Sequence, residues 1–128
     1  MNKKVLIVDD HIDIRHLVSI TLDCSNYQLL QAASADEALA LLINNPPDLI
    51  VLDVMMPGKM NGFQLCEYIK NNPLYCSIKV ILLTAKGSQK DIDEGNRVKS
   101  DAYLVKPFSP LTLLKKVDEL LDKSIDAF

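Results

Sequence analysis

Short, unbroken runs of apolar residues alternate with amphipathic segments along the chain. The clearest runs cover residues 5–8, 49–52, 80–83 and 103–105, and a weaker one covers 27–32. A run without polar interruptions is typical of a strand that is buried on both faces, as in a parallel sheet. Right-handed helical crossovers join such strands. The pattern therefore predicts an α/β fold, a doubly wound sandwich of three layers with five strands and five helices.

The amphipathic segments carry helix-start signals. Ser34 precedes Ala35-Asp36-Glu37, which is typical of a capping box, and Asn61 stands where it can cap a third helix. Ser109 followed by a proline is typical of an N-cap and a first helical position.

Two other helices differ in how well their apolar residues can anchor them. The first is predicted over residues 12–24, and its inward-facing side chains are Ile14, Leu17, Val18 and Leu22. The segment 88–98 has almost no large apolar residues besides Ile92 and Val98. We expect that helix to be short and weakly held.

Polar residues of one chemical set stand where four of the predicted strands end. They are Asp9, Asp10, Asp53, Thr84 and Lys106. In open parallel sheets, ligands bind outside the carboxyl ends of the strands, so these side chains should converge. Clustered carboxylates need a proton or a cation between them, and magnesium prefers carboxylate oxygens, water and phosphate. The set predicts a site for a divalent cation and a phosphoryl group.

Composition and charge exclude several other classes. The 128 residues suit one domain, and a hydrophobic share of 48% can fill its core. The net charge of −3 gives no basic surface for direct nucleic-acid binding. The three cysteines have no paired metal-ligand spacing and are expected to be reduced thiols. The first apolar run is too short for a signal peptide or a membrane span, so we expect no membrane insertion.

The chain resembles the receiver domain of bacterial two-component response regulators, including those of chemotaxis. The resemblance rests on Asp9-Asp10, Asp53 in LDVMMPG, Thr84-Ala85 in LLTAK and Lys106-Pro107 in YLVKPF. It implies a flavodoxin-like sheet with strand order 2-1-3-4-5 and a cytoplasmic protein. We expect a receiver domain over residues 1–124, a short tail over 125–128 and no output domain.

The resemblance also implies a chemistry for the acidic cluster. Asp53 would be the phosphoacceptor, taking a phosphoryl group from a phosphohistidine. Mg²⁺, or Mn²⁺, would be the cofactor, held by Asp10, Asp53 and the backbone carbonyl of Met55, with Asp9 acting through a water. Lys106 would neutralise phosphoryl charge. Such a protein is not an enzyme in the ordinary sense, because it catalyses only its own phosphoryl transfer and autodephosphorylation.

A switch and a set of partners follow from the same resemblance. Thr84 would bind the phosphoryl group after transfer, Ala85 would leave room for the strand end to move, and Tyr103 would turn inward. The surface of the fourth helix, fifth strand and fifth helix would change with them. The implied partners are a sensor histidine kinase or a histidine phosphotransfer protein, a downstream target or output domain, and a second copy in a phosphorylation-dependent dimer.

Some positions depart from the family's usual pattern. Lys59 is an apparent insertion in the loop after Asp53, Asn61 replaces a frequent aspartate, and Lys99 stands where glycine is usual. His11 and His16 have no ligand spacing with a cysteine or a second acid, so we interpret both as solvated or helix-packing residues.

Two other functions fit parts of the pattern. A small Mg²⁺-dependent phosphohydrolase would also use Asp53 as nucleophile, but Met55 stands where a second acid would be expected, and no segment forms a substrate cap. A flavodoxin-like nucleotide binder needs a glycine in the first strand-to-helix turn. That turn reads DDHID.

Overall fold

A computed structural model of the chain shows a five-stranded parallel sheet in the order β2-β1-β3-β4-β5. It describes residues 3–23, 27–56, 58–85 and 88–121. The strands are β1 (Lys4–Val8), β2 (Gln28–Ala32), β3 (Leu49–Asp53), β4 (Lys79–Thr84) and β5 (Ala102–Val105). The helices are α1 (Ile12–Asp23), α2 (Ala35–Asn44), α3 (Gly62–Asn71), α4 (Gln89–Arg97) and α5 (Pro110–Leu121). The predicted fold and strand order are confirmed.

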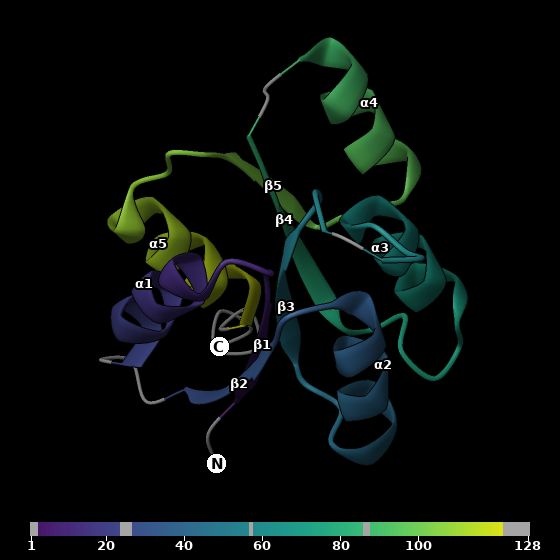
Figure 1. Cartoon of the computed structure of the whole chain (residues 1–128), viewed down its shortest axis with the longest axis horizontal. Helices are drawn as coiled ribbons and strands as arrows, with labels where there is room; N and C mark the ends of the chain where they lie inside the picture. Colours follow the sequence, from purple (N-terminus) through teal and green to yellow (C-terminus); the bar gives the residue numbers. More distant parts are fainter. Residues whose placement is uncertain (1–2, 24–26, 57, 86–87, 122–128) are drawn as a thin grey trace, which may run out of the picture.

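Helices cover both faces of the sheet, α1 and α5 on one side and α2, α3 and α4 on the other (Figure 1). Alternate residues of each strand feed two separate cores. In β1, Leu6 and Val8 pack towards α2 and α3. Val5 and Ile7 pack towards α1 and α5. Burial on both faces explains why β1, β3 and β4 appear in the sequence as unbroken apolar runs.

The helix caps lie where the sequence predicts them, with one difference in detail. Asn61 and Gln64 form a full capping box at the start of α3. Ser34 accepts a hydrogen bond from the Glu37 amide, at 3.2 Å. The Glu37 carboxylate, however, accepts from the amide of Ala33, one residue before the cap. Backbone amides at the start of α2 and just before it therefore still have hydrogen-bond partners, one from Ser34 and one from Glu37.

The prediction for α1 is wrong at one residue. Val18 and Leu22 are buried, and Ile14 packs against the same core, but Leu17 is 40% exposed. Leu17 lies one residue before Val18, about 100° around the helix, so it falls at the margin of the buried stripe. The predicted last residue, Cys24, lies outside the described residues, as do residues 122–128 with the predicted tail.

The short, weakly anchored α4 is confirmed. Gly95 is its only buried residue, and Ile92 is partly exposed. The turn after α4 contains a residue in the left-handed backbone conformation although no glycine stands there. This residue is Lys99, with φ 64°. Within the described ranges, none of the helices has both the length and the apolar character that a membrane span requires.

Candidate acidic site at the carboxyl edge of the sheet

The predicted site residues lie at one edge of the sheet, at or just after the ends of β1, β3, β4 and β5. Asp9 follows β1, Asp53 ends β3, and Thr84 ends β4. All three side chains are buried. They come to the same edge because β1 and β4 both pair with β3 in parallel, with Val8 beside Leu52 and Leu83 beside Asp53.

Lys106 binds the two buried carboxylates at once. Its Nζ donates to Asp9 Oδ2 and to Asp53 Oδ1, both at 3.2 Å. The Lys106–Pro107 peptide bond is cis, a geometry that the sequence permits without showing it. One ammonium thus offsets part of the charge of two acids that have almost no contact with water.

The remaining Asp53 oxygen has no such support. Asp53 is 2% exposed, and its Oδ2 has no hydrogen-bond partner among the described residues. Burial raises the pKa of Asp53 above 3.8, the charge of Asp9 raises it further, and Lys106 opposes both without cancelling them. Burial lowers the pKa of Lys106, but the charges of Asp53 and Asp9 outweigh it and leave that pKa raised. The site therefore lacks positive charge near Asp53.

Gly62 lets α3 begin directly against the end of β3, a role that the sequence did not reveal. A Cβ at this position would overlap the backbone oxygen of Asp53. The Gly62 amide also donates to the carbonyl of Val54, at 3.1 Å. Next to Asn61, this glycine has the sequence appearance of an ordinary cap or turn, and only the folded chain shows that a side chain does not fit.

His11 lies within the acidic cluster, which corrects our interpretation of it. Its side chain is 66% exposed, as expected for a solvated residue, but it does have acids beside it. Its Nδ1 lies 3.1 Å from Asp9 Oδ1 and 3.3 Å from Asp10 Oδ1. The His11 amide donates to Asp9 Oδ1, which turns the chain back over Asp9. Spacing along the chain cannot show this, because the tight turn after β1 brings the groups together.

Arg15 supports the same turn from α1. Its Nη1 donates to the backbone carbonyl of Asp9, at 2.6 Å. No sequence signal marks this contact, since an arginine one turn into an amphipathic helix usually faces solvent.

The predicted switch residues lie on the β4–β5 side of the site. Thr84 donates to Asp91 Oδ2 of α4, a long hydrogen bond at 3.5 Å. Tyr103 is half-buried and hydrogen-bonded to Thr84. Burial is the largest effect on its hydroxyl and leaves the pKa raised; the hydrogen bond to Thr84 lowers that pKa, and the charge of Asp91 raises it. Ala85 is exposed beyond the strand end.

The acidic cluster fits a divalent cation. Asp9, Asp10, His11 and Asp53 each offer a ligand atom, and these atoms all lie within 4.8 Å of one another. The unpartnered, buried oxygen of Asp53 supports the same interpretation, since a cation would supply what it lacks. Met55 exposes its side chain, and its amide donates to Asp53 Oδ1 at 3.4 Å.

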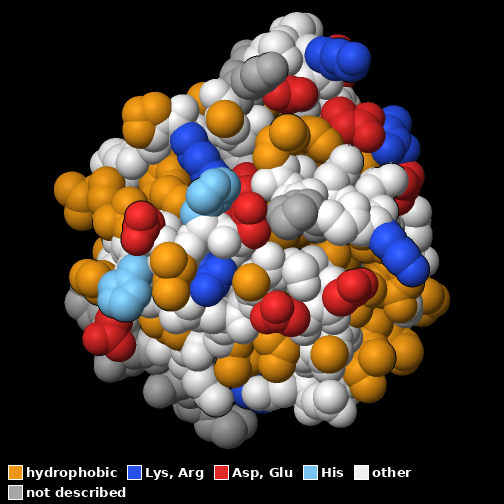
Figure 2. Space-filling view, viewed as in Figure 1, with side chains coloured by type: hydrophobic (Ala, Val, Ile, Leu, Met, Phe, Trp, Pro, Cys, Tyr) orange, Lys and Arg blue, Asp and Glu red, His pale blue; other side chains and the backbone are white. Residues whose placement is uncertain are grey.

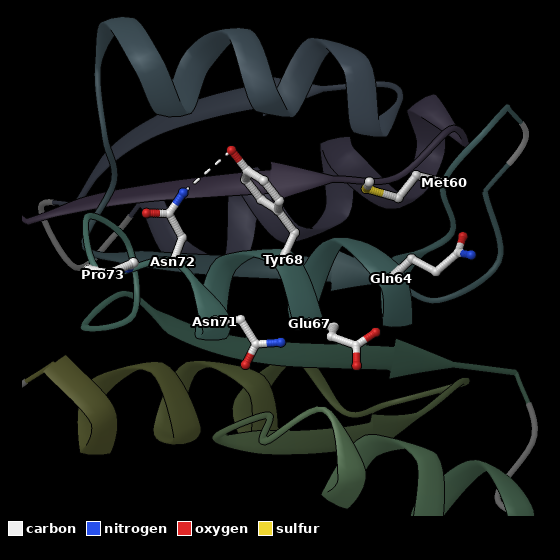
Figure 3. A pocket seen from close by; sticks show the side chains of 7 residues that line it. All are labelled: Met60, Gln64, Glu67, Tyr68, Asn71, Asn72 and Pro73. Atoms are coloured by element: carbon white, nitrogen blue, oxygen red, sulfur yellow. Dashed lines mark hydrogen bonds between the residues drawn. The ribbon is translucent and has the colours of Figure 1, made fainter.

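The surface around the cluster is open. Near the middle of the face in Figure 2, acidic side chains touch a histidine and lie close to a basic side chain. A hollow lined by Asp10, Met55 and Met56 opens at this place. A separate groove runs along α3, where Tyr68 accepts a hydrogen bond from Asn72 and Met60 lies at the far end (Figure 3). That groove lacks the clustered charges of the acidic site.

The sequence profile of the response regulator receiver domain matches residues 5–118. The chain belongs to the response regulator receiver family. A receiver is a signalling module of two-component systems rather than an enzyme in the ordinary sense, and membership implies a histidine kinase as partner. An acidic cluster such as Asp9, Asp10 and Asp53 is typical of the divalent metal site of receivers.

Relatives and solved structures agree with this assignment. The receiver is 36% identical to the phosphate regulon transcriptional regulatory protein PhoB of Pseudomonas aeruginosa, over 97% of this chain and 54% of that protein. It is 38% identical to the alkaline phosphatase synthesis transcriptional regulatory protein PhoP of Bacillus subtilis, over 97% of this chain and 50% of that one. The chain thus spans about half the length of these curated relatives.

Among solved structures, the chemotaxis protein CheY4 of Vibrio cholerae is 39% identical, with a TM-score of 0.87. The match covers 94% of this chain and 100% of CheY4. A putative response regulator from Chloroflexus aurantiacus is 32% identical, with a TM-score of 0.90 over 95% of this chain and 99% of its own.

Proposed function

We propose that this receiver is a phosphorylation-dependent switch in which Asp53 accepts a phosphoryl group from a phosphohistidine of a sensor kinase or histidine phosphotransfer protein. The observation that carries the proposal is the Asp53 carboxylate itself. It is buried, one oxygen is bound to Lys106, and the other has no partner among the described residues. Such a group is costly to keep unless it has a function.

The transfer is a displacement at phosphorus. A carboxylate oxygen of Asp53 forms the new P–O bond, the P–N bond to the donor imidazole breaks, and the imidazole keeps the electron pair and takes up a proton. Lys106, 3.2 Å from Asp53, holds positive charge beside the phosphoryl oxygens throughout. Hydrolysis of the resulting acyl phosphate by water returns the free carboxylate.

Mg²⁺ is the cation that we expect at the cluster, where it would supply further positive charge against the phosphoryl oxygens. Asp10 and Asp53 would hold it directly, together with the backbone carbonyl of Met55, and Asp9 would act through a water. Asp10 is suited to direct contact because it is exposed at the cluster's outer side.

Thr84 would link phosphorylation of Asp53 to a change at the protein surface. Its bond to Asp91 is long, so a phosphoryl group on Asp53 can compete for the hydroxyl. Tyr103 shares that hydroxyl, and a Cβ on Gly95 would lie 3.3 Å from its ring. A shift of Thr84 would therefore move Tyr103 against α4, which has few buried contacts to resist. The changed α4–β5–α5 surface would act on a downstream target or output domain, or on a second copy.

The proposal is tested by intact mass after incubation with Mg²⁺ and a small acyl-phosphate donor. Wild-type protein should gain one phosphoryl group, and Asp53→Asn should gain none. An adduct that persists in Asp53→Asn would contradict the assignment, and so would a wild type that gains none.

A cytoplasmic location suits this role, since the phosphohistidine of a sensor kinase is formed from ATP.

A further inference from the structure

The ring of His11 is hydrogen-bonded to Asp9, and the same position suits a metal ligand. Its Nδ1 lies 3.1 Å from Asp9 Oδ1 and 3.3 Å from Asp10 Oδ1. Two adjacent ligands on a first-row metal, with bonds of about 2.1 Å, are separated by about 3.0 Å in an octahedral shell. The imidazole therefore stands at the spacing of a neighbouring coordination position.

A second observation, at the buried side of the same cluster, also points to a ligand. Asp53 is 2% exposed, contributes one of the clustered ligand atoms, and keeps Oδ2 without a partner among the described residues. Of the basic side chains, Lys106 reaches the carboxylates of Asp9 and Asp53, whereas Arg15 donates to the Asp9 backbone carbonyl. The carboxylates thus outnumber the ammonium group that faces them.

The chemistry of the four donors decides which cation suits them. Carboxylate oxygens alone favour Mg²⁺, Ca²⁺ or Mn²⁺, whereas an imidazole nitrogen is a good ligand for Mn²⁺, Co²⁺, Ni²⁺ and Zn²⁺ and a poor one for Mg²⁺. Exposure of His11 does not oppose this role, because its ring lies at the outer side of the cluster, where a cation would enter.

We propose that His11 binds the metal directly through its imidazole, beside Asp10 and Asp53, and makes this receiver bind first-row transition cations more tightly than Mg²⁺. The inference deepens the proposed function, since it concerns the same acidic site. Metal binding is nevertheless measured without any phosphoryl donor.

The first test is pulsed EPR of bound Mn²⁺ in tag-free protein, using electron spin echo modulation to detect a directly bound nitrogen. His16 lies on α1 and is outside the cluster, so His16→Ala is the matched control. The ¹⁴N modulation of an imidazole should be present in wild type and in His16→Ala and absent in His11→Ala. Absence in wild type, or persistence in His11→Ala, would overturn the proposal.

The second test is calorimetric titration of the same proteins with Ni²⁺ and with Mg²⁺. His11→Ala should weaken Ni²⁺ binding by at least about tenfold and change Mg²⁺ binding by no more than about twofold. Equal losses for both cations would show that His11 only shapes the loop, and no loss for either would show that it is not a ligand. Either result would overturn the proposal.

The two proposals can fail separately. If Mg²⁺-supported phosphorylation of Asp53 succeeds and no nitrogen contact is found, the proposed function stands and the role of His11 is wrong. If the nitrogen contact is found and Asp53 is never phosphorylated, the metal site stands and the proposed function is wrong.

Discussion

Asp53 is the residue whose ionisation should affect the stability of the receiver in an unusual direction. Its pKa is raised in the folded chain, first by burial and then by Asp9, so the folded state holds the proton to a higher pH than the unfolded state does. The free energy of unfolding should therefore fall as the pH rises from 3.8 through the raised pKa.

Asp53→Asn removes this penalty. In metal-free protein near pH 7, urea denaturation should show a higher midpoint for the variant, and the difference should shrink as the pH is lowered towards 3.8. Asp93→Asn, which removes an exposed carboxylate of α4, is the matched control. A variant that is less stable than wild type near pH 7 would show that Asp53 is well compensated in the folded state.

Lys106 should be the residue whose loss costs the metal-free receiver most stability at this site. Lys106→Met leaves Asp9 and Asp53 buried without their shared cation, so we expect a loss of about 2–4 kcal/mol of unfolding free energy. Lys116→Met breaks an ion pair at the exposed surface and should cost less than about 0.5 kcal/mol.

Because the ion pair is mutual, the Lys106→Met loss should be smaller when Asp53→Asn is already present. Equal losses in both backgrounds, measured by urea denaturation, would mean that the 3.2 Å contact carries no energy.

At the scale of elements, the strand ends could be predicted from the sequence and the turns could not. The strands that end at the site, β1, β3, β4 and β5, contain the clear apolar runs, so the polar residue that follows each run can be recognised from the sequence. The contacts of His11 depend on the turn after β1, and the need for Gly62 depends on how closely α3 approaches β3. Leu17 was misplaced because a helical stripe has margins that periodicity alone does not resolve.

The turn between α4 and β5 offers a test of backbone strain. Lys99 adopts φ 64°, a conformation that glycine tolerates better than lysine does. Lys99→Gly should raise the free energy of unfolding by about 0.5–1 kcal/mol, whereas Lys90→Gly, inside the exposed part of α4, should lower it by about 1 kcal/mol. Urea denaturation of both variants checks this, and a Lys99→Gly protein less stable than wild type would contradict it.

At the scale of the whole molecule, one set of exposed apolar side chains lies on α1 and at the start of α5. Ile12 and Ile20 of α1 are 63% and 65% exposed, and Leu111 at the start of α5 is 76% exposed. Figure 2 shows hydrophobic side chains on this flank, beside the central acidic and basic groups. A helical protein that brings a phosphohistidine to Asp53 would find this apolar surface next to the site.

Ile20→Ser should therefore separate two kinds of donor. Phosphorylation by a phosphorylated histidine phosphotransfer protein that serves the wild type should slow by about tenfold, which corresponds to about 1.4 kcal/mol of lost contact. Phosphorylation by a small acyl phosphate should not change. Ile43 is 73% exposed but lies on α2, so Ile43→Ser should affect neither donor. If Ile20→Ser and Ile43→Ser slow the protein donor equally, α1 is not the docking surface.

Asp53, and no other residue, should carry the phosphoryl group. Borohydride reduction after phosphorylation converts an aspartyl phosphate into homoserine, and peptide mass spectrometry then locates that homoserine. We predict homoserine at position 53 alone, in the peptide that contains the end of β3. Homoserine at Asp9 or Asp10, or none at position 53 in protein that has gained a phosphoryl group, would contradict the account.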